Sequence, residues 1–233
     1  VPRFNITTLI TMIETLRIAN YMAPSSTFSW EVASFDGSEI TASNGMTARI
    51  KTANDNLQPA EFVFILGSWG TEHYHNQKLT AWLRKRVRAG ERICGVELGS
   101  YIVARAGLLD GKLATIHWSW LNGFKENFNR VEVEESLFTL DRKVMTCSGG
   151  LAGVDLMLRL IEEINGSSFS GEIADQMLHH PIRSAISPQR GTMGRSTETM
   201  RPLLREAMTL IENNIEEPLT VPQIANLLGV SQR

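Results

Sequence analysis

Hydrophobic and polar residues along the first part of the chain follow patterns typical of strands. Residues 28–33 alternate apolar and polar side chains, as a half-buried strand does. Residues 62–66 are a continuous apolar run ending at Gly67, which indicates a strand buried on both faces. Further strands are predicted over residues 92–96 and, as the two arms of a hairpin, over residues 137–140 and 144–147.

Helical patterns lie between these strands. Apolar residues at helical spacing predict a helix over residues 7–21, with a stripe made of Leu9, Met12, Ile13 and Leu16. Further helices are predicted over residues 79–89, 99–106 and 151–164. Because helices and strands take turns along the chain, the expected fold class is α/β, a mostly parallel sheet sandwiched by helices.

This fold class also indicates where a ligand would bind. In open parallel sheets, ligands bind beyond the carboxyl ends of the strands. The segments predicted to lie at the carboxyl ends of strands are residues 2–5, 67–70, 97–100 and the stretch around His117.

Both ends of the chain read as incomplete, because Val1 and Pro2 suggest the tail of a strand and Arg233 falls where a helix should start.

Beyond this region the sequence changes character. Residues 184–199 contain Ser, Pro, Gln, Gly, Thr and Arg with almost no apolar periodicity, which indicates an interdomain linker. The expected domains are therefore residues 1–183, this linker, and a small all-α segment over residues 200–233. In that last segment helical spacing resumes at Leu204, Met208, Ile211 and Ile215.

The end of the chain predicts a helix-turn-helix. Thr220 can cap a short helix, and Pro222 is tolerated in its first turn. Gly229 supplies the turn, and Ser231 would cap a second helix whose first residues enter the major groove of DNA. A plain helical hairpin is the alternative interpretation.

This segment resembles the first of the two helix-turn-helix motifs of AraC-type transcription regulators. The resemblance covers residues 200–233, and the second motif is absent. It implies double-stranded promoter DNA as a partner, contacted at Ser231, Gln232 and Arg233.

Composition adds constraints. The 233 residues are 42% hydrophobic and 21% charged, as in ordinary globular proteins. The net charge of −2 is not that of a general nucleic-acid binder, so DNA contact must be local. No apolar run approaches the roughly 20 residues that cross a bilayer, and no signal peptide is recognised, so no membrane partner is expected. Two cysteines do not make a disulfide framework, which favours a cytoplasmic location.

A second resemblance covers nearly all of residues 1–183. Residues 96–111, VELGSYIVARAGLLDG, resemble the nucleophile elbow of the DJ-1/PfpI (class I glutamine amidotransferase-like) family, especially the subgroup fused to AraC-type domains. In that family a strand ends, a cysteine stands at a sharp turn, and a helix begins with a small residue. Other stretches found in the family's order are LRIAN at 16–20, IHW at 116–118 and CSGG at 147–150.

The departures from the family pattern change the expected function. Counting back from Gly99, the elbow position is Glu97 rather than cysteine. The family's acidic residue after the first strand reads Asn5, and its Gly-Gly pair reads Gly67-Ser68. We therefore expect no catalytic residues and no cofactor, but a binding pocket that senses a small metabolite.

The chemistry of these positions favours a cationic or quaternary-ammonium, amino-acid-like effector. Glu97 would offer negative charge, and amides near Gly67 and Ser68 could meet a carboxylate of the same ligand. A cation over an aromatic face gains about 0.5–2 kcal/mol. Candidate aromatic walls are Trp69, Trp118 and Trp120, with His117 beside them, so the expected ligand-binding residues are Asn5, Gly67, Ser68, Trp69, Glu97, His117 and Trp118.

Several alternatives stay open. Glu97 can have a purely structural role at the start of a helix, and Trp120 and His117 can be packing residues. The main rival function is a DJ-1/PfpI-type hydrolase or glyoxalase that uses Cys94 or Glu97, although Cys94 reads as a buried thiol. A third reading is a sensor that controls partners by protein contact alone. A homodimer is expected from the family.

A metal site is not expected. The neighbouring His179 and His180 point apart on a helix. No acidic or cysteine partner stands at ligand spacing from the histidines considered, which are His73, His75, His179 and His180.

Overall fold

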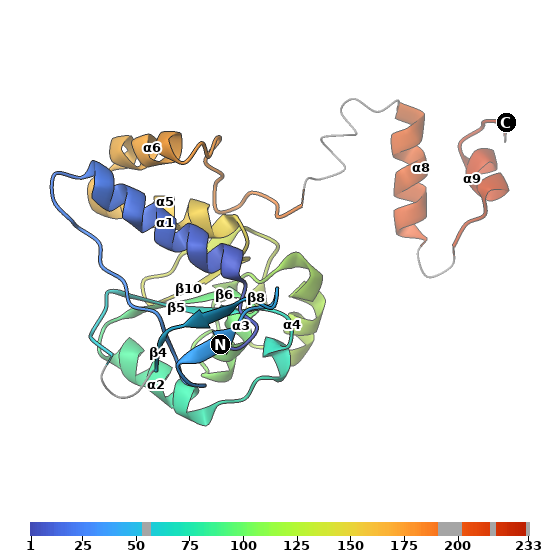
Figure 1. Ribbon diagram of the computed structural model, residues 1–233. Coiled ribbons are helices and arrows are strands. Elements are labelled where there is room, and N and C mark those ends of the chain that lie inside the picture. The colour runs from blue at the N-terminus through green and yellow to red at the C-terminus, as the bar shows by residue number, and fades with distance from the viewer. Residues whose placement is uncertain (53–56, 191–201, 215–217, 232–233) are drawn as a thin grey trace. The chain divides into compact units, whose positions relative to one another are not determined.

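The computed structural model describes residues 1–52, 57–190, 202–214 and 218–231. The chain divides into two compact units, Val1–Gln189 and Arg190–Arg233 (Figure 1). The first unit therefore ends at Gln189 rather than at residue 183, so the start of the predicted linker packs on this unit. Gln232 and Arg233, predicted to contact DNA, lie outside the described residues.

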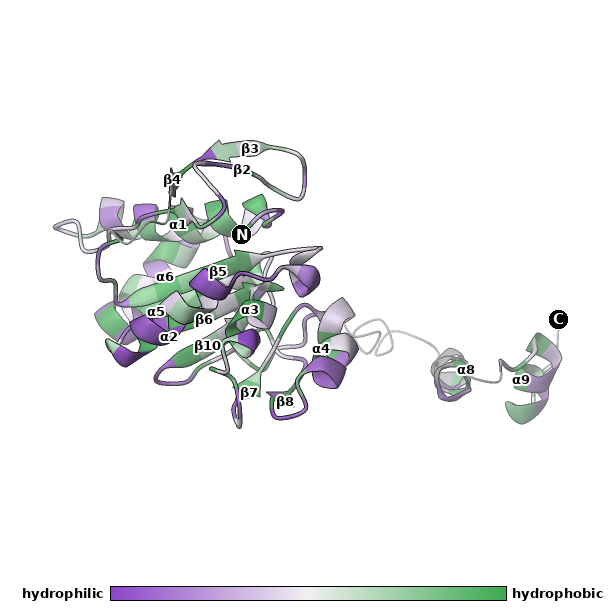
Figure 2. Cartoon of the chain, turned by 90° about the horizontal axis from the view of Figure 1, so that it is seen from below, coloured by the Kyte–Doolittle hydropathy of each residue, from purple (hydrophilic) through white to green (hydrophobic). Residues whose placement is uncertain are grey.

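A four-stranded sheet forms the centre of the first unit. Its strands follow the order β5 (Phe62–Gly67), β6 (Arg92–Glu97), β10 (Val144–Cys147) and β9 (Phe138–Thr139). The first three are parallel, and β9 pairs antiparallel with β10. The predicted strands over 62–66 and 92–96 and the predicted hairpin are thus confirmed. Figure 2 shows hydrophobic residues concentrated in these central strands.

Three two-stranded sheets lie around this centre. They pair β1 (Ala33–Ser34) with β4 (Lys51–Thr52), β2 (Glu39–Thr41) with β3 (Thr47–Arg49), and β7 (Leu113–Ala114) with β8 (Glu132–Val133). The strand predicted over residues 28–33 is wrong except at Ala33. The Asn20 side chain accepts hydrogen bonds from the amides of Thr27 and Phe28 and donates one to the Phe28 carbonyl, which ties this segment to a helix instead.

Helices cover both faces of the central sheet, as predicted (Figure 1). Side chains of β6 alternate between two cores: Ile93 joins the core with Leu83 and Ile102, and Cys94 joins the core with Leu156. The first face carries α2 (Gln77–Arg88) and α3 (Gly99–Arg105), with α4 (Leu121–Asn127) nearby. The second carries α1 (Ile6–Met22), α5 (Ala152–Asn165) and α6 (Ser167–Gln176).

The buried side of α1 differs from the predicted stripe. Its fully buried residues are Thr8, Met12, Thr15 and Ala19, so only Met12 belongs to both sets. Small residues let α1 approach α5 closely, since a β-carbon at Gly153 would lie 3.0 Å from Met12 Cγ and 3.3 Å from Thr8 Cγ2. The close approach, rather than the largest side chains, therefore decides which face is buried.

The second unit contains two described helices, α8 (Pro202–Asn213) and α9 (Val221–Leu227). The predicted cap of α9 is present: the Thr220 amide and hydroxyl both donate to Gln223 Oε1, at 2.8 and 2.7 Å. Gly229 has a φ of 66°, and the Val230 amide donates to the Ala225 carbonyl, which ends the helix in a turn. In the described parts of both units, no helix is long and apolar enough to cross a membrane.

Candidate ligand-binding site

A cavity of about 320 Å³ lies at the carboxyl ends of β5, β6 and β10. Ser68 and Trp69 follow β5, Glu97 ends β6, and Ser148 follows β10. This is the position expected for a ligand in a parallel sheet. Six of the seven residues predicted to bind ligand line it: Asn5, Ser68, Trp69, Glu97, His117 and Trp118.

Glu97 occupies the turn between β6 and α3 with a φ of 54°. A positive φ on a side chain of this size is a strained conformation, and it fixes the elbow at Glu97, with Cys94 inside the strand. The elbow is tight, because a β-carbon at Gly99 would lie 1.8 Å from the Ile65 carbonyl oxygen. The predicted position of the turn, with Glu97 at the elbow, is therefore confirmed.

The Glu97 carboxyl group is buried, with an exposed fraction of 5%. Its Oε1 accepts a hydrogen bond from Ser68 Oγ at 2.8 Å, and its Oε2 has no hydrogen-bond partner among the described residues. Burial raises the pKa of this carboxyl group, while the Ser68 hydroxyl and the nearby Asn5 side chain act in the opposite direction. The result is a half-satisfied carboxyl group at the cavity wall.

A glycine loop brings this wall close. Gly149 has a φ of 88°, and a β-carbon there would lie 2.7 Å from Glu97 Cβ and 3.0 Å from Oε2. The next amide, of Gly150, donates to Thr8 Oγ1 on α1 at 2.8 Å. The loop between β10 and α5 is thus held against Glu97 without a side chain between them.

Two other predictions about the first strands need correction. Gly67 does not line the cavity; its α-carbon faces Thr71 and Gly99 instead. The Ser68 amide donates to Thr71 Oγ1 at 3.1 Å, so it is not available for a ligand carboxylate. Asn5 accepts from the Thr8 amide and caps α1, so part of its polarity serves the helix.

Two tryptophans flank the cavity. Trp69 and Trp118 line it and keep exposed fractions of 61% and 43%. Trp120 packs edge-on against Tyr101 in the core, so it is a packing residue rather than a cavity wall. His117 lines the cavity with Nδ1 2.8 Å from Ser119 Oγ, and burial lowers its pKa, which favours the neutral imidazole.

Arg183 and Gln189 are among the cavity residues that sequence reasoning missed. Gln189 Nε2 donates to the carbonyls of Ile116 and Ser136, at 2.8 and 2.9 Å, and its Oε1 accepts from the Trp118 amide at 2.7 Å. The polar, aperiodic composition of this segment indicated a linker. Gln189 is held by side-chain hydrogen bonds to distant backbone groups, and such bonds leave no pattern of apolar and polar residues in a single sequence.

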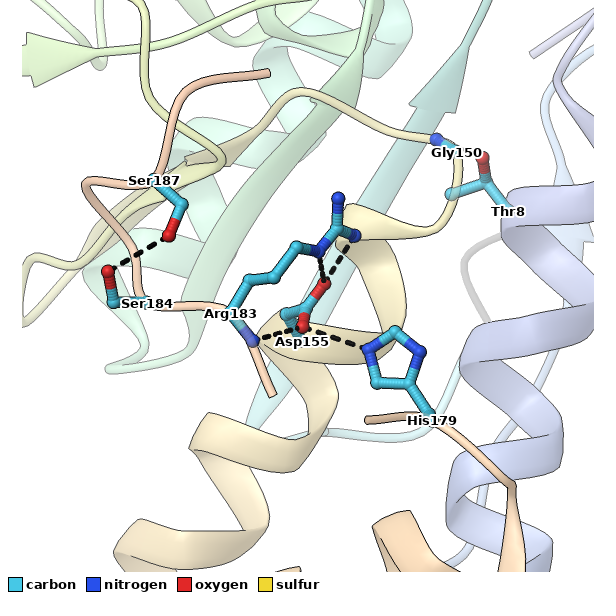
Figure 3. Close-up of polar contacts among 7 residues, drawn as sticks. All are labelled: Thr8, Gly150, Asp155, His179, Arg183, Ser184 and Ser187. Atoms are coloured by element: carbon cyan, nitrogen blue, oxygen red, sulfur yellow. Dashed lines mark hydrogen bonds and ion pairs between the residues drawn. The ribbon is translucent and has the colours of Figure 1, made fainter. Parts of the chain in front are cut away.

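Arg183 is held by a carboxylate on α5. Asp155 is fully buried and accepts hydrogen bonds from the Arg183 amide, Nε and Nη2, at 2.8, 3.0 and 2.6 Å (Figure 3). His179 Nε2 lies 2.9 Å from the other side of the same carboxylate. Across the described residues, no three His, Cys, Asp or Glu side chains are grouped to hold a metal ion.

Neither cysteine has the environment of a nucleophile. Cys94 and Cys147 are fully buried, and neither lines the cavity. Burial raises the pKa of Cys94 well above its usual value, and burial raises that of Cys147 to about 12. A thiol nucleophile needs the opposite, an accessible thiolate.

Comparison with known proteins now identifies the family. Residues 4–163 match the DJ-1/PfpI family. The chain belongs to the DJ-1/PfpI family. A solved structure titled as an AraC family transcriptional regulator from Pseudomonas putida superposes with a TM-score of 0.70 and 20% identity, covering 76% of this chain and 95% of that one. This likeness shows the shared DJ-1/PfpI fold.

Two relatives extend along almost the whole chain. The HTH-type transcriptional regulator GbdR of Pseudomonas aeruginosa is 33% identical over 99% of this chain and 63% of its own length. The HTH-type transcriptional regulator CdhR of the same organism is 31% identical over the full chain and 69% of its own length. The chain thus spans about 63% of GbdR. An enzyme, isonitrile hydratase of Pseudomonas putida, is 24% identical over 61% of this chain.

Proposed function

We propose that this DJ-1/PfpI chain is the sensing part of a DNA-binding transcription regulator and that its cavity takes a cationic or quaternary-ammonium, amino-acid-like effector. The observation that carries the proposal is Glu97, which lines a cavity flanked by half-exposed tryptophans and whose buried Oε2 has no hydrogen-bond partner among the described residues. A ligand cation would satisfy this carboxylate and gain from the aromatic faces.

The proposal of a regulator rests on the relatives. Two proteins named as HTH-type transcriptional regulators match this chain over 99% and 100% of its length. The capped helix α9 and the turn at Gly229 agree with the first half of a helix-turn-helix. We assign this end to an AraC-type domain that contacts promoter DNA at Ser231, Gln232 and Arg233, and we expect a homodimer in the cytoplasm.

The pocket is proposed to be non-catalytic. The alternative function is that of a hydrolase or glyoxalase, and the likeness to the enzyme isonitrile hydratase is the observation in its favour. Cys94 is buried in the core against α5, away from the cavity. Glu97 holds the nucleophile position of the elbow, and we assign its carboxyl group to binding the effector rather than to attack on a substrate.

A thermal-shift screen tests the proposal. The chain is melted with choline, trimethylglycine, carnitine and L-arginine, and in parallel with acetate and succinate. A bound effector at 100 times its dissociation constant stabilises by about 2.7 kcal/mol. We expect a shift with cations that disappears in Glu97→Gln. Shifts with the anions alone, or shifts unchanged in Glu97→Gln, would contradict the proposal.

DNA contact needs its own test. The chain is used to retain duplexes from a random double-stranded DNA pool, beside a variant in which Ser231, Gln232 and Arg233 are alanine. We expect retention that the triple substitution weakens. Equal retention by both chains would contradict the assignment of these residues.

A further inference from the structure

A guanidinium lines the cavity as well as a carboxyl group. Arg183 lines it together with Glu97, and its side chain keeps an exposed fraction of 35%. Asp155 engages Nε and Nη2, which form one edge of the guanidinium. Figure 3 shows the remaining nitrogen, Nη1, pointing away from that carboxylate. Nη1 has no hydrogen-bond partner within the part of the chain that the structure describes.

The two charges do not neutralise each other. No ion pair joins Glu97 and Arg183 in the described residues, and Glu97 Oε2 stays buried without a partner. Both nevertheless act on one buried thiol: burial is the main cause of the raised pKa of Cys147, and after the Gly149 amide and Asp155, Glu97 raises this pKa and Arg183 lowers it. A cavity with an unpaired acid and an open guanidinium edge fits a ligand that carries both charges.

We propose that Arg183 binds the anionic group of the effector while Glu97 faces its cationic group, so that the effector is a small zwitterion. The inference rests on the proposed function. It assigns carboxylate binding to Arg183 instead of the Ser68 amide, because that amide already donates a hydrogen bond to Thr71. A guanidinium is suited to the task because its planar fork can serve two carboxylates at different edges.

Asp155 acts here as a positioning residue. It is fully buried, and it takes three hydrogen bonds from Arg183, including one from the backbone amide. These bonds fix both the chain and the side chain of Arg183, so the open edge has one orientation. Because the Asp155–Arg183 pair is neutral as a whole, the ligand carboxylate gains a directed hydrogen bond rather than a net charge.

The test compares two probes with the same cation. Trimethylglycine and choline share a trimethylammonium group, but choline has a neutral hydroxymethyl group where trimethylglycine has a carboxylate. Isothermal titration of the whole chain should show trimethylglycine binding about tenfold tighter or more, as one charge-assisted hydrogen bond predicts. L-Arginine and agmatine form a second pair that differs in the same carboxylate, and the same ratio is expected for whichever pair binds.

Variants of Arg183 then assign the effect. In Arg183→Gln the tenfold preference for trimethylglycine over choline should disappear. Arg130→Gln changes an exposed arginine whose side chain is 77% exposed, so it is the control and should keep the preference. Arg183→Lys should lose most of the preference, because an ammonium cannot serve two carboxylates through a fork. The ratio of the two probes within one variant does not depend on how much of that variant is folded.

The outcomes separate the inference from the proposed function. Cation binding without preference for the zwitterion, or an unchanged preference in Arg183→Gln, would overturn this inference alone. Failure of all four probes to bind the unmodified chain would overturn it together with the proposed function. If Arg183→Gln does not fold, the two probe pairs on the unmodified chain still decide.

Discussion

Ser68 and Glu97 meet through one hydrogen bond of 2.8 Å, from the hydroxyl of Ser68 to Oε1 of Glu97. The bond satisfies half of a carboxyl group that is 5% exposed and leaves Oε2 buried without a partner in the described residues. A buried polar atom without a partner costs free energy. The site is thus under-satisfied in a way that a cation would correct.

Glu97 should make stability depend on pH in a defined direction. Because burial raises its folded-state pKa above 4.5, its contribution is fully present below pH 4.5 and is lost as pH rises through the raised value. The free energy of unfolding of the unmodified chain should therefore fall relative to Glu97→Gln across this window, as measured by urea unfolding. Parallel curves for the two chains would contradict the burial of an ionisable Glu97.

Binding of a cation should show the opposite trend. A cation binds the ionised carboxylate, so affinity should rise over the same pH window in the unmodified chain. Titration calorimetry at several pH values measures this. Glu97→Gln should show a flat profile, and a matching rise in that variant would assign the titration to another group.

The elbow should not tolerate a side chain on the residue that begins α3. Gly99→Ala places a β-carbon 1.8 Å from the Ile65 carbonyl oxygen, so the backbone must shift. We expect the free energy of unfolding to fall by about 1–3 kcal/mol, the usual cost of overpacking. Gly171→Ala in α6 is the matched control, since its β-carbon would meet nothing within 4 Å. Equal melting temperatures for the two variants would contradict the close packing of this turn.

Both thiols should be unreactive in the folded chain. Cys94 and Cys147 are fully buried with raised pKa values, so iodoacetamide at neutral pH should label neither before unfolding. Mass spectrometry with and without urea measures this. Rapid labelling of Cys94 in the folded chain would favour the enzyme alternative.

Gln189 should hold the end of the first unit in place. Gln189→Ala removes the donor to the carbonyls of Ile116 and Ser136 and the acceptor of the Trp118 amide. We expect a loss of about 1–3 kcal/mol in urea unfolding and faster hydrogen exchange at the Trp118 amide. Ser184→Ala, which removes an exposed hydroxyl contact to Ser187, is the control. Unchanged exchange at Trp118 would show that the segment is not held by Gln189.

The sequence predicted the central sheet and the elbow well because their signals are local. Apolar runs marked β5 and β6, and the position of Gly99 placed Glu97 at the turn. Of the six predicted residues that line the cavity, Ser68, Trp69 and Glu97 lie at the carboxyl ends of β5 and β6, and the carboxyl ends of parallel strands share one edge of the sheet.

What the sequence did not predict depends on contacts between distant residues. Residues 28–32 alternate like a strand, but Asn20 ties Thr27 and Phe28 to α1. The buried face of α1 is set by its fit against Gly153. Arg183 is held at the cavity by a hydrogen bond to Asp155, and Gln189 by one to the Ile116 carbonyl. Both partners lie far away in the sequence.

The most direct test of the cationic-effector site is isothermal titration of the cation that gives the largest thermal shift, with the unmodified chain, Glu97→Gln and Glu132→Gln. Glu132 is an exposed carboxylate on β8, so its substitution makes the same change in charge away from the cavity. The account predicts binding that Glu132→Gln keeps and Glu97→Gln weakens by about tenfold or more. Equal affinity in all three chains would contradict it and leave Glu97 a structural role at the turn.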